Sequence, residues 1–360
     1  MTSSILTGTT RFTTDANIKN ILVTGGAGFI ASWVVRHLVV NYPGYRVICL
    51  DKLGYCSALR NVDMLRDMPN FMFIRGDITK KDDVYKVFEE QQIDTVIHLA
   101  AESHVEHSFG NPYVFTHTNV MGTQVVLEAC KDFKVRRVVH MSTDEVYGEV
   151  KNGEKDLLES SILVPTNPYS ASKASSDMLI SAYLKSFNVP CMVVRCNNVY
   201  GPHQFPEKVI PKFISLLSRG QKCVLHGDGM NTRRYLYASD AVDAIDTVLH
   251  KGEIGNIYNA GTHNELSNLD VCKHILQAFD LDPSDPEVMA KHVDFTRDRL
   301  FNDLRYAIDS QKISRLGWYP KVDFDYGLRI TKDWYLHHGN NWWGDVDEFL
   351  VPFPETKFDI

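Results

Sequence analysis

Short apolar runs alternate with stretches of helical apolar spacing through the first two hundred residues. The apolar runs predict strands, and they lie at residues 19–24, 46–51, 70–74, 94–101, 137–141 and 190–195. The stretches between them predict helices, and they lie at residues 32–42, 82–91, 119–131 and 174–187. Strands and helices that alternate at this spacing form a doubly wound parallel sheet. We therefore predict an α/β fold.

The first predicted strand runs into a glycine-rich loop, Gly25-Gly-Ala-Gly28-Phe-Ile-Ala31. In dinucleotide-binding proteins the first glycine permits a tight turn, the second lets the backbone approach a pyrophosphate, and the next helix points its N-terminus at the phosphates. The second strand ends at Asp51, where a carboxylate would meet the adenosine ribose and repel the 2′-phosphate of NADP. The alternative is that Asp51 is an ordinary surface residue. We expect a Rossmann fold that binds NAD.

The expected cofactor contacts lie at the glycine loop and at the following strand ends, where doubly wound sheets bind ligands. Asp77 is expected near the adenine, and residues 99–101 form a floor of small side chains under the cofactor. The full set is Gly25, Gly28, Phe29, Ile30, Asp51, Lys52, Asp77, Ile78, Leu99, Ala100, Ala101, Tyr169 and Lys173.

The strand–helix rhythm loosens beyond residue 200. A Pro-punctuated stretch at 203–212, a glycine-rich and then basic stretch at 226–237, and Pro/Asp pairs within 280–287 replace it. The start of the chain is rich in Ser and Thr, which favours disorder. We therefore expect four parts: a disordered N-terminal tail (1–18), an NAD-binding Rossmann domain with the catalytic residues (19–200), a smaller lobe that binds the second ligand and is interleaved with that domain (201–335), and a C-terminal tail (336–360).

The composition excludes several classes of protein. The chain has 360 residues and a formal net charge of −7, and it lacks a basic tract for nucleic acid and an apolar run long enough to span a bilayer. Seven cysteines without CxxC spacing indicate neither a disulfide framework nor a zinc site, and we expect no metal. Reduced thiols are typical of the cytoplasm, which is the expected location, with no nucleic-acid or membrane partner.

A tyrosine and a lysine one helical turn apart, in Tyr169-Ser-Ala-Ser-Lys173, follow a strand that ends in Ser142 and Thr143. A tyrosine that removes an alcohol proton must ionise near neutral pH, which requires roughly 4–5 kcal/mol of stabilisation relative to its usual pKa of about 10. We expect the ammonium of Lys173 to favour the phenolate and the hydroxyl of Thr143 to hydrogen-bond the substrate. This pattern predicts alcohol oxidation with hydride transfer to NAD⁺.

Two adjacent carboxylates, Asp144 and Glu145, follow Thr143 directly. Neighbours in a regular strand point to opposite faces, so both serve one site only if the chain turns just after Thr143. Once C4 of a sugar is a ketone, elimination across C5–C6 needs a base at C5 and an acid at O6, which two differently tuned carboxyls can provide. The alternative is that the carboxylates cap or salt-bridge locally.

These motifs resemble the extended short-chain dehydrogenase/reductases and, within them, the nucleoside-diphosphate-glucose 4,6-dehydratases. The resemblance covers about residues 19–335 and is most specific where the Thr-Asp-Glu motif is combined with Tyr-x-x-x-Lys. The matching stretches are GGAGFIAS, DKLGYCS, HLAAESHV, STDEVYG, PTNPYSASK, NNVYGPHQFPEKVIPKFI, HGDG followed by Arg233, YNAGTHNE, RYAID and LGW.

The resemblance implies a mechanism and a substrate site. Tyr169 would act as the base at O4, Asp144 as the acid toward the C6 hydroxyl and Glu145 as the base at C5, and hydride would return to C6. It also implies a homodimer paired through the helices around 119–131 and 170–187. The implied nucleotide-sugar contacts are Glu102, Ser103, Asn198, Lys208, Arg233, Asn264, Arg299 and Asn302.

Two departures from the family pattern bear on specificity. Ala31 replaces the third glycine of the loop. Asn302 stands where bacterial thymidine-nucleotide enzymes usually have histidine, and asparagine at this position is more similar to the plant and fungal enzymes that use UDP-glucose. The nucleotide base of the substrate stays open between thymine and uracil, since one methyl group changes the binding free energy by only ~1–3 kcal/mol. Two alternatives to the dehydratase are a UDP-hexose 4-epimerase or decarboxylase, in which the carboxylates are idle, and a nucleotide-sugar or NAD sensor without turnover.

Overall fold

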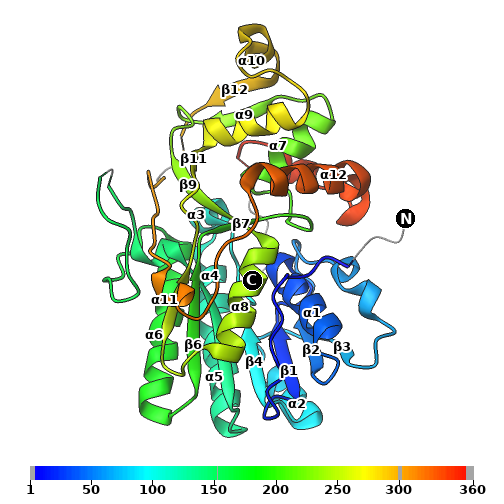
Figure 1. Cartoon of the computed structure of the whole chain (residues 1–360), viewed down its shortest axis with the longest axis vertical. Coiled ribbons are helices and arrows are strands. Elements are labelled where there is room, and N and C mark those ends of the chain that lie inside the picture. The colour runs from blue at the N-terminus through cyan, green and yellow to red at the C-terminus, as the bar shows by residue number, and fades with distance from the viewer. Residues whose placement is uncertain (1–4, 152, 299–301, 354–360) are drawn as a thin grey trace.

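The structure is a computed structural model that describes residues 5–151, 153–298 and 302–353 (Figure 1). Within these residues, seven parallel strands form one sheet in the order β10-β6-β5-β4-β1-β2-β3. The strands are β1 (Asn20–Thr24), β2 (Arg46–Asp51), β3 (Phe71–Arg75), β4 (Thr95–His98), β5 (Arg137–Thr143), β6 (Cys191–Cys196) and β10 (Ile257–Ala260). The chain reverses its direction of winding between β1 and β4, and this order confirms the predicted doubly wound Rossmann-type fold.

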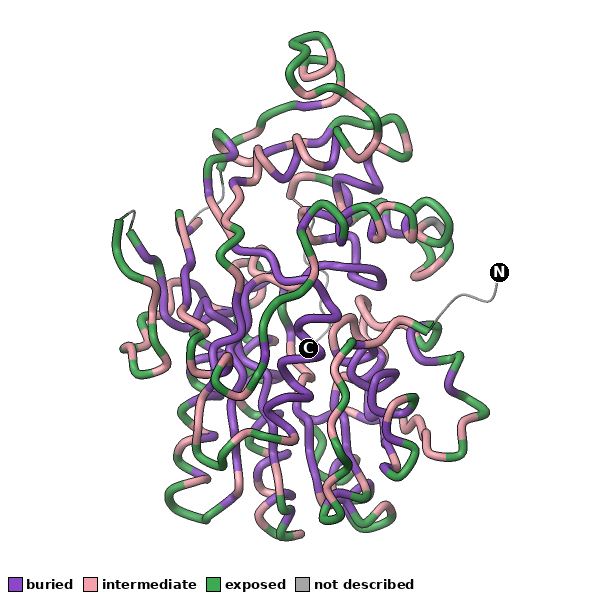
Figure 2. Tube along the Cα trace, viewed as in Figure 1, coloured by how far each residue is buried: buried purple, intermediate pink, exposed green. Residues whose placement is uncertain are grey.

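Alternate side chains of each strand point to opposite faces of the sheet. Ile21 and Val23 of β1 belong to the core with α1 (Phe29–Asn41) and α8 (Ala238–Lys251), whereas Leu22 between them belongs to the opposite core. The helices of that opposite face are α2 (Lys81–Gln91), α5 (Thr123–Asp132) and α6 (Pro168–Phe187). The strands are apolar on both sides because both faces are covered, which explains why they read as continuous apolar runs (Figure 2).

The predicted helix over 119–131 is only partly α-helical. A π-helical segment over Thr116–Gly122 continues α4 (Pro112–Phe115) and leads into α5. A short helix, α3 (Val105–Gly110), precedes them. These segments run between β4 and β5 on the face that carries α6.

The smaller lobe lies above the sheet in Figure 1. It holds two small sheets, β7–β9–β11 and β8–β12. Their strands and the accompanying helices are β7 (Asn198–Tyr200), β8 (Cys223–His226), β9 (Thr232–Tyr237), β11 (Glu265–Ser267), β12 (Val293–Thr296), α7 (Val209–Ser218), α9 (Asn268–Ala278), α10 (Pro286–His292), α12 (Phe324–Trp342) and α13 (Asp347–Leu350). The short helix α11 (Gln311–Ser314) lies beside the large sheet, next to β10 (Figure 1). Between these segments the chain returns to the large sheet as α8 and β10, so the two lobes are interleaved.

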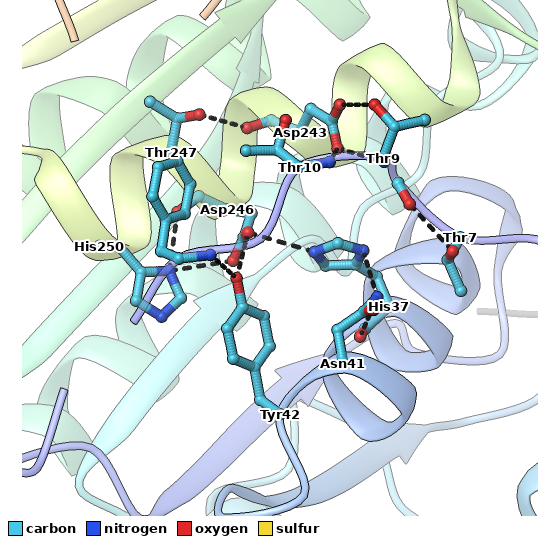
Figure 3. Close-up of polar contacts among 12 residues, drawn as sticks. Thr7, Thr9, Thr10, His37, Asn41, Tyr42, Asp243, Asp246, Thr247 and His250 are labelled. Atoms are coloured by element: carbon cyan, nitrogen blue, oxygen red, sulfur yellow. Dashed lines mark hydrogen bonds and ion pairs between the residues drawn. The ribbon is translucent and has the colours of Figure 1, made fainter. Parts of the chain in front are cut away.

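The expectation of a disordered tail over 1–18 is wrong for residues 5–18. The backbone amides of Thr9 and Thr10 donate to the buried carboxylate of Asp243 at 2.7 and 2.9 Å (Figure 3). The carbonyl of Leu6 accepts from Arg36 at 2.8 Å. Further along, the amide of Phe12 donates to the hydroxyl of Tyr42. The segment is held because its backbone satisfies polar groups of α1, α8 and Tyr42, although half of its residues stay exposed.

The boundary expected at residue 335/336 is also wrong, because it falls inside α12. The chain beyond α12 packs against the body of the protein in its described part, which ends at Phe353. We call Trp343–Phe353 the C-terminal strap. Its Phe349 stacks on Tyr55, and Trp343 meets Phe205 edge to face. The aromatic composition of this end therefore reflects packing.

All seven cysteines lie in described positions as free thiols, and six of them are buried. In the described ranges, none of the helices combines the length and the apolar character needed to cross a membrane.

Candidate active site

The glycine loop forms one wall of a cleft between the two lobes, at the carboxyl ends of the strands. Gly25 has φ of +69°, and a Cβ there would lie 2.7 Å from Cα of Ala100. At Gly28, which caps α1 without a side-chain hydrogen bond, a Cβ would meet only the carbonyl of Gly25. The N-terminus of α1 therefore faces the cleft through backbone alone, as a dinucleotide pyrophosphate requires.

Asp51, at the end of β2, is held in place by the same loop. Its carboxylate accepts from the amide of Ala27 at 3.0 Å and from the amide of Leu53 at 2.7 Å. Burial raises the pKa of Asp51, and these two backbone donors oppose that shift. The carboxylate is thus fixed at the cleft wall, where it fits the ribose hydroxyls of NAD.

The chain turns directly after Thr143, as two carboxylates acting in one site require. β5 ends at Thr143, and a 3-10 turn over Asp144–Tyr147 begins there. The hydroxyl of Thr143 accepts from the amide of Glu145 at 3.3 Å and caps this turn. The turn replaces the alternation of a strand and keeps both carboxylates buried at the strand end.

Asp144 lies behind Thr143 with both carboxylate oxygens hydrogen-bonded. Oδ2 accepts from Nδ2 of Asn197 at 2.7 Å, and Oδ1 accepts from the hydroxyl of Thr143 at 3.2 Å. Burial raises the pKa of Asp144 to about 6, although both donors favour the ionised form. A carboxyl tuned in this way exchanges protons close to neutral pH.

Glu145 lines the cleft. Burial raises the pKa of Glu145 to about 7, and the neighbouring Asp144 carboxylate adds to this effect, while Arg233 opposes it. Two adjacent carboxyls that titrate around neutrality share a proton, since ionisation of one disfavours ionisation of the other.

Tyr169 and Lys173 project into the cleft from the first turns of α6. This helix starts with a capping box between Asn167 and Ser170 and with Pro168 in its first turn. The fixed start places Tyr169 close enough to Thr143 for a hydrogen bond between their hydroxyl groups.

The expected effect of Lys173 on Tyr169 is not found. Burial raises the pKa of Tyr169, the Glu145 carboxylate raises it further, and the hydrogen bond from Thr143 lowers it. The ammonium of Lys173 donates to the carbonyl of Met141 at 2.7 Å, and burial lowers the pKa of this lysine to about 8. Lys173 is thus anchored to β5 rather than to the phenol.

The smaller lobe supplies basic and amide side chains to the opposite wall. Arg233 donates to Oδ1 of Asn302 at 3.3 Å and lies over the ring of Tyr306 at 4.5 Å. Lys208 donates to the carbonyl of Ser103 at 2.7 Å, which joins the two walls. Asn198 lines the cleft with a buried Oδ1 that has no hydrogen-bond partner among the described residues.

The structure brings most of the expected site residues to the cleft wall. Those that line it are Gly25, Gly28, Phe29, Ile30, Asp51, Leu99, Ala100, Ala101, Ser103, Thr143, Glu145, Tyr169, Lys173, Asn198, Lys208, Arg233 and Asn302.

Four expected contacts and Asp144 are not among the residues that line the cleft, and Lys52 is exposed. Lys52 and Glu102 form an ion pair of 2.8 Å, Asp77 accepts from Thr79 in a local turn, and Ile78 belongs to the core under the sheet. The polar side chains among them already have partners: Lys52 pairs with Glu102, and Asp77 accepts from Thr79.

Asn264 does not reach the cleft. It is exposed in the loop between β10 and β11, and the next residue, Glu265, pairs with Arg234 and Arg305 instead. Those ion pairs turn the loop away from the cleft. Arg299 lies outside the described residues.

The sequence analysis missed Asn197, which holds Asp144, although it belongs to the same Cys196–Pro202 stretch as Asn198. It also missed a buried cluster of His104, His107 and Glu207. Their potential ligand atoms lie within 4.8 Å of one another and could hold a metal ion, while Glu207 accepts a hydrogen bond of 2.8 Å from Tyr55. A His-x-x-His spacing before α4 was the available signal.

Comparison with known proteins places this geometry among related enzymes. A family model described as GDP-mannose 4,6 dehydratase matches residues 22–331. A trifunctional UDP-glucose 4,6-dehydratase/UDP-4-keto-6-deoxy-D-glucose 3,5-epimerase/UDP-4-keto-L-rhamnose reductase of Arabidopsis thaliana is 49% identical over 341 residues, which are 93% of this chain and 50% of that protein. The chain therefore spans about half the length of the first curated relatives that it matches.

Two single-function relatives match over almost their whole length. The dTDP-D-glucose 4,6-dehydratase of Homo sapiens is 46% identical over 336 residues, which are 93% of this chain and 95% of that protein. The crystal structure of DesIV, a dTDP-glucose 4,6-dehydratase from Streptomyces venezuelae with NAD bound, has a TM-score of 0.84 and 40% identity, with 90% of this chain and 98% of that chain covered.

Proposed function

The chain belongs to the nucleotide-sugar 4,6-dehydratases of the extended short-chain dehydrogenase/reductase superfamily, and we propose that it converts dTDP-glucose or UDP-glucose to the 4-keto-6-deoxy nucleotide sugar and water. The reaction is an oxidation at C4, an elimination across C5–C6 and a return of hydride to C6. It makes the protein an NAD-dependent hydro-lyase. The relatives named above support this proposal.

The chain's own residues divide the proton transfers of this reaction. Tyr169 removes the proton of the C4 hydroxyl, aided by the hydroxyl of Thr143 beside it. When bound, NAD supplies the hydride acceptor and donor. Lys173 stays anchored on Met141 and orients the ribose, and Asp51 holds the adenosine end of the cofactor.

The buried pair of carboxyls is the observation that carries the dehydratase proposal. Oxidation at C4 needs neither the carboxyl of Asp144 nor that of Glu145, whereas elimination needs a proton donor at O6 and a proton acceptor at C5. The pKa of Glu145 lies above that of Asp144, the reverse of the order expected for a base and an acid. A proton on Asp144 removes one cause that raises the pKa of Glu145, but burial, the larger cause, remains, so we assign the roles of acid and base from the family resemblance and not from these pKa values.

The nucleotide side of the substrate is held by the smaller lobe. Arg233 and Lys208 bring positive charge to the cleft, and the unsatisfied Oδ1 of Asn198 offers an acceptor. A nucleoside diphosphate fits this charge and this acceptor. We propose Ser103 and Asn302 as further contacts on the same wall.

The experiment is incubation of the purified protein and NAD⁺ with UDP-glucose and with dTDP-glucose. We expect a 4-keto-6-deoxy product, detected by its absorbance in alkali and by mass spectrometry. UDP-galactose as the sole product would identify a 4-epimerase instead. Tight NAD binding with no conversion of either sugar would identify a sensor.

We also propose a homodimer paired through α5 and α6. Met121, Met178 and Phe187, which are 49%, 62% and 52% exposed, lie on or beside these helices, and exposed apolar side chains that gather on one face mark interaction sites. Light scattering on the protein should give twice the chain mass, and Met178→Glu should reduce it. The free thiols support a reducing compartment, and we propose the cytoplasm; fractionation of cells tests this.

A further inference from the structure

The C-terminal strap forms part of the active-site cleft. Its Leu350 and Pro352 line the cleft together with the catalytic residues. Nζ of Lys212 donates to the carbonyl of Val351 at 2.8 Å, and the ring of His226 stacks on Phe353 at 4.7 Å. These contacts fasten the strap to α7 and β8 of the smaller lobe.

The other contacts of the strap reach the cofactor side of the cleft. Phe349 stacks on Tyr55 with ring centroids 5.4 Å apart and an interplanar angle of 12°, and it meets the ring of Phe205 edge to face at 4.8 Å. Tyr55 belongs to the loop that follows Asp51, and its neighbours Cys56 and Ser57 line the cleft. We call Tyr55, Phe205 and Phe349 the aromatic clasp.

The clasp also connects to the substrate loop. The hydroxyl of Tyr55 donates to the buried carboxylate of Glu207 at 2.8 Å, and the following Lys208 donates to the carbonyl of Ser103 at 2.7 Å. Three segments far apart in the sequence are therefore joined at Tyr55: the loop after β2, the loop before α7 and the strap. Because the strap is also fastened to α7 and β8, a movement of the loop after β2 away from the smaller lobe would separate Tyr55 from Phe349.

We propose that the aromatic clasp retains the dinucleotide in the cleft by locking the loop after β2 over its adenosine end. The inference rests on the proposed function in that the dinucleotide is NAD. The clasp residues are positioning residues, since they act through Asp51, Cys56 and Ser57 rather than on the reacting atoms. Because the strap is attached to the smaller lobe, release of the cofactor then requires the two lobes to move apart.

The test measures the dissociation rate of NAD directly, without sugar, by exchange of labelled NAD against an excess of unlabelled NAD. Phe349→Ala should release NAD about tenfold faster, since an aromatic pair contributes a factor of roughly 3–10 beyond area burial. Phe295→Ala, at a 52% exposed phenylalanine on β12, is the matched control and should release NAD at the wild-type rate.

Two further variants separate the clasp from general loss of structure. Phe349→Tyr keeps the ring and should restore slow release, whereas Phe349→Leu keeps the apolar bulk and should be intermediate. If wild-type protein binds NAD and folded Phe349→Ala releases it at the wild-type rate, the clasp proposal is overturned while the proposed function stands. If wild-type protein binds no NAD, the proposed function fails and the clasp proposal fails with it. Should Phe349→Ala not fold, wild-type release by folded Phe349→Leu is the overturning result.

Discussion

Asn197 donates a hydrogen bond of 2.7 Å from Nδ2 to Oδ2 of Asp144, and its own Oδ1 accepts from the amide of Thr262 at 2.9 Å. The side chain bridges the end of β6 and the loop after β10, and it is 3% exposed. The orientation of Asp144 is therefore set from outside its own turn as well as by Thr143, which caps that turn. Asn197 acts through Asp144 and is a positioning residue.

Replacement of Asn197 by Leu should lower kcat for water loss about tenfold with little change in KM. A hydrogen bond to a charged group contributes about 1.5–3 kcal/mol, and its loss leaves Asp144 without one of its two side-chain donors. The bond favours the ionised carboxylate, so its removal should raise the pKa of Asp144 and move the basic limb of the kcat profile to higher pH. Steady-state kinetics across pH checks both effects. Asn264→Leu, in the exposed loop, is the matched control and should leave kcat and KM unchanged; an equal loss there would refute a specific role of Asn197.

Replacement of the two carboxyls should separate the steps of elimination. Asp144→Asn should slow water loss while exchange of the C5 proton with solvent persists, because Glu145 still acts as the base. Glu145→Gln should suppress that exchange by about a hundredfold, in the range of general base catalysis. Deuterium incorporation at C5, followed by NMR in D₂O, measures the exchange. Equal loss of exchange in both variants would contradict the division of roles.

Glu145 should also make folding stability depend on pH. Its folded pKa of about 7 exceeds the ordinary value of 4.5, so the folded state binds the proton more tightly than the unfolded state. The contribution of Glu145 to the free energy of unfolding is therefore fully present below pH 4.5 and is lost as the pH rises to about 7, by about 3 kcal/mol. Glu145→Gln removes the dependence, so its stability relative to wild type should rise between pH 5 and pH 8.

Urea unfolding of both proteins at a series of pH values tests this dependence. Glu89→Gln, on an exposed position of α2, serves as the control and should follow the wild-type curve. A constant difference between wild type and Glu145→Gln across this range would show that Glu145 is not buried in its neutral form.

The arrangement of the large sheet could be predicted from the sequence because its strands are buried on both faces. Continuous apolar runs such as those of β2 and β5 have few other interpretations when each leads into a helix. The ends of the chain could not be predicted in this way. The partners of Thr9 and Phe349 lie more than 140 residues away along the chain, and no local pattern marks them.

The site could be predicted as far as its residues belong to one motif. Thr143, Asp144 and Glu145 are adjacent in sequence, and the buried turn keeps them together. The pKa of Tyr169 could not be predicted from the sequence, because burial raises it more than neighbouring charges shift it. Nor could the hydrogen bond of Lys173 to the carbonyl of Met141 be predicted. Sequence spacing shows which groups can meet but not which are desolvated.

The N-terminal segment should contribute measurably to stability through Asp243. This carboxylate is fully buried, accepts from the amides of Thr9 and Thr10, and pairs with Lys321 at 3.0 Å. Asp243→Ala should lower the free energy of unfolding by about 2–4 kcal/mol, because it leaves buried donors without their acceptor.

Urea unfolding measures the loss for Asp243→Ala, and limited proteolysis should then cut within residues 5–18 before the rest of the chain. Asp63→Ala removes an exposed ion pair with Arg66 and should cost less than about 1 kcal/mol, which makes it a control for the loss of a carboxylate alone. If Asp243→Ala unfolds like Asp63→Ala and its N-terminus resists protease, the contacts of Thr9 and Thr10 do not hold the segment. A loss confined to Asp243→Ala would instead show that these first residues are part of the folded domain, because the buried carboxylate needs their amides to be satisfied.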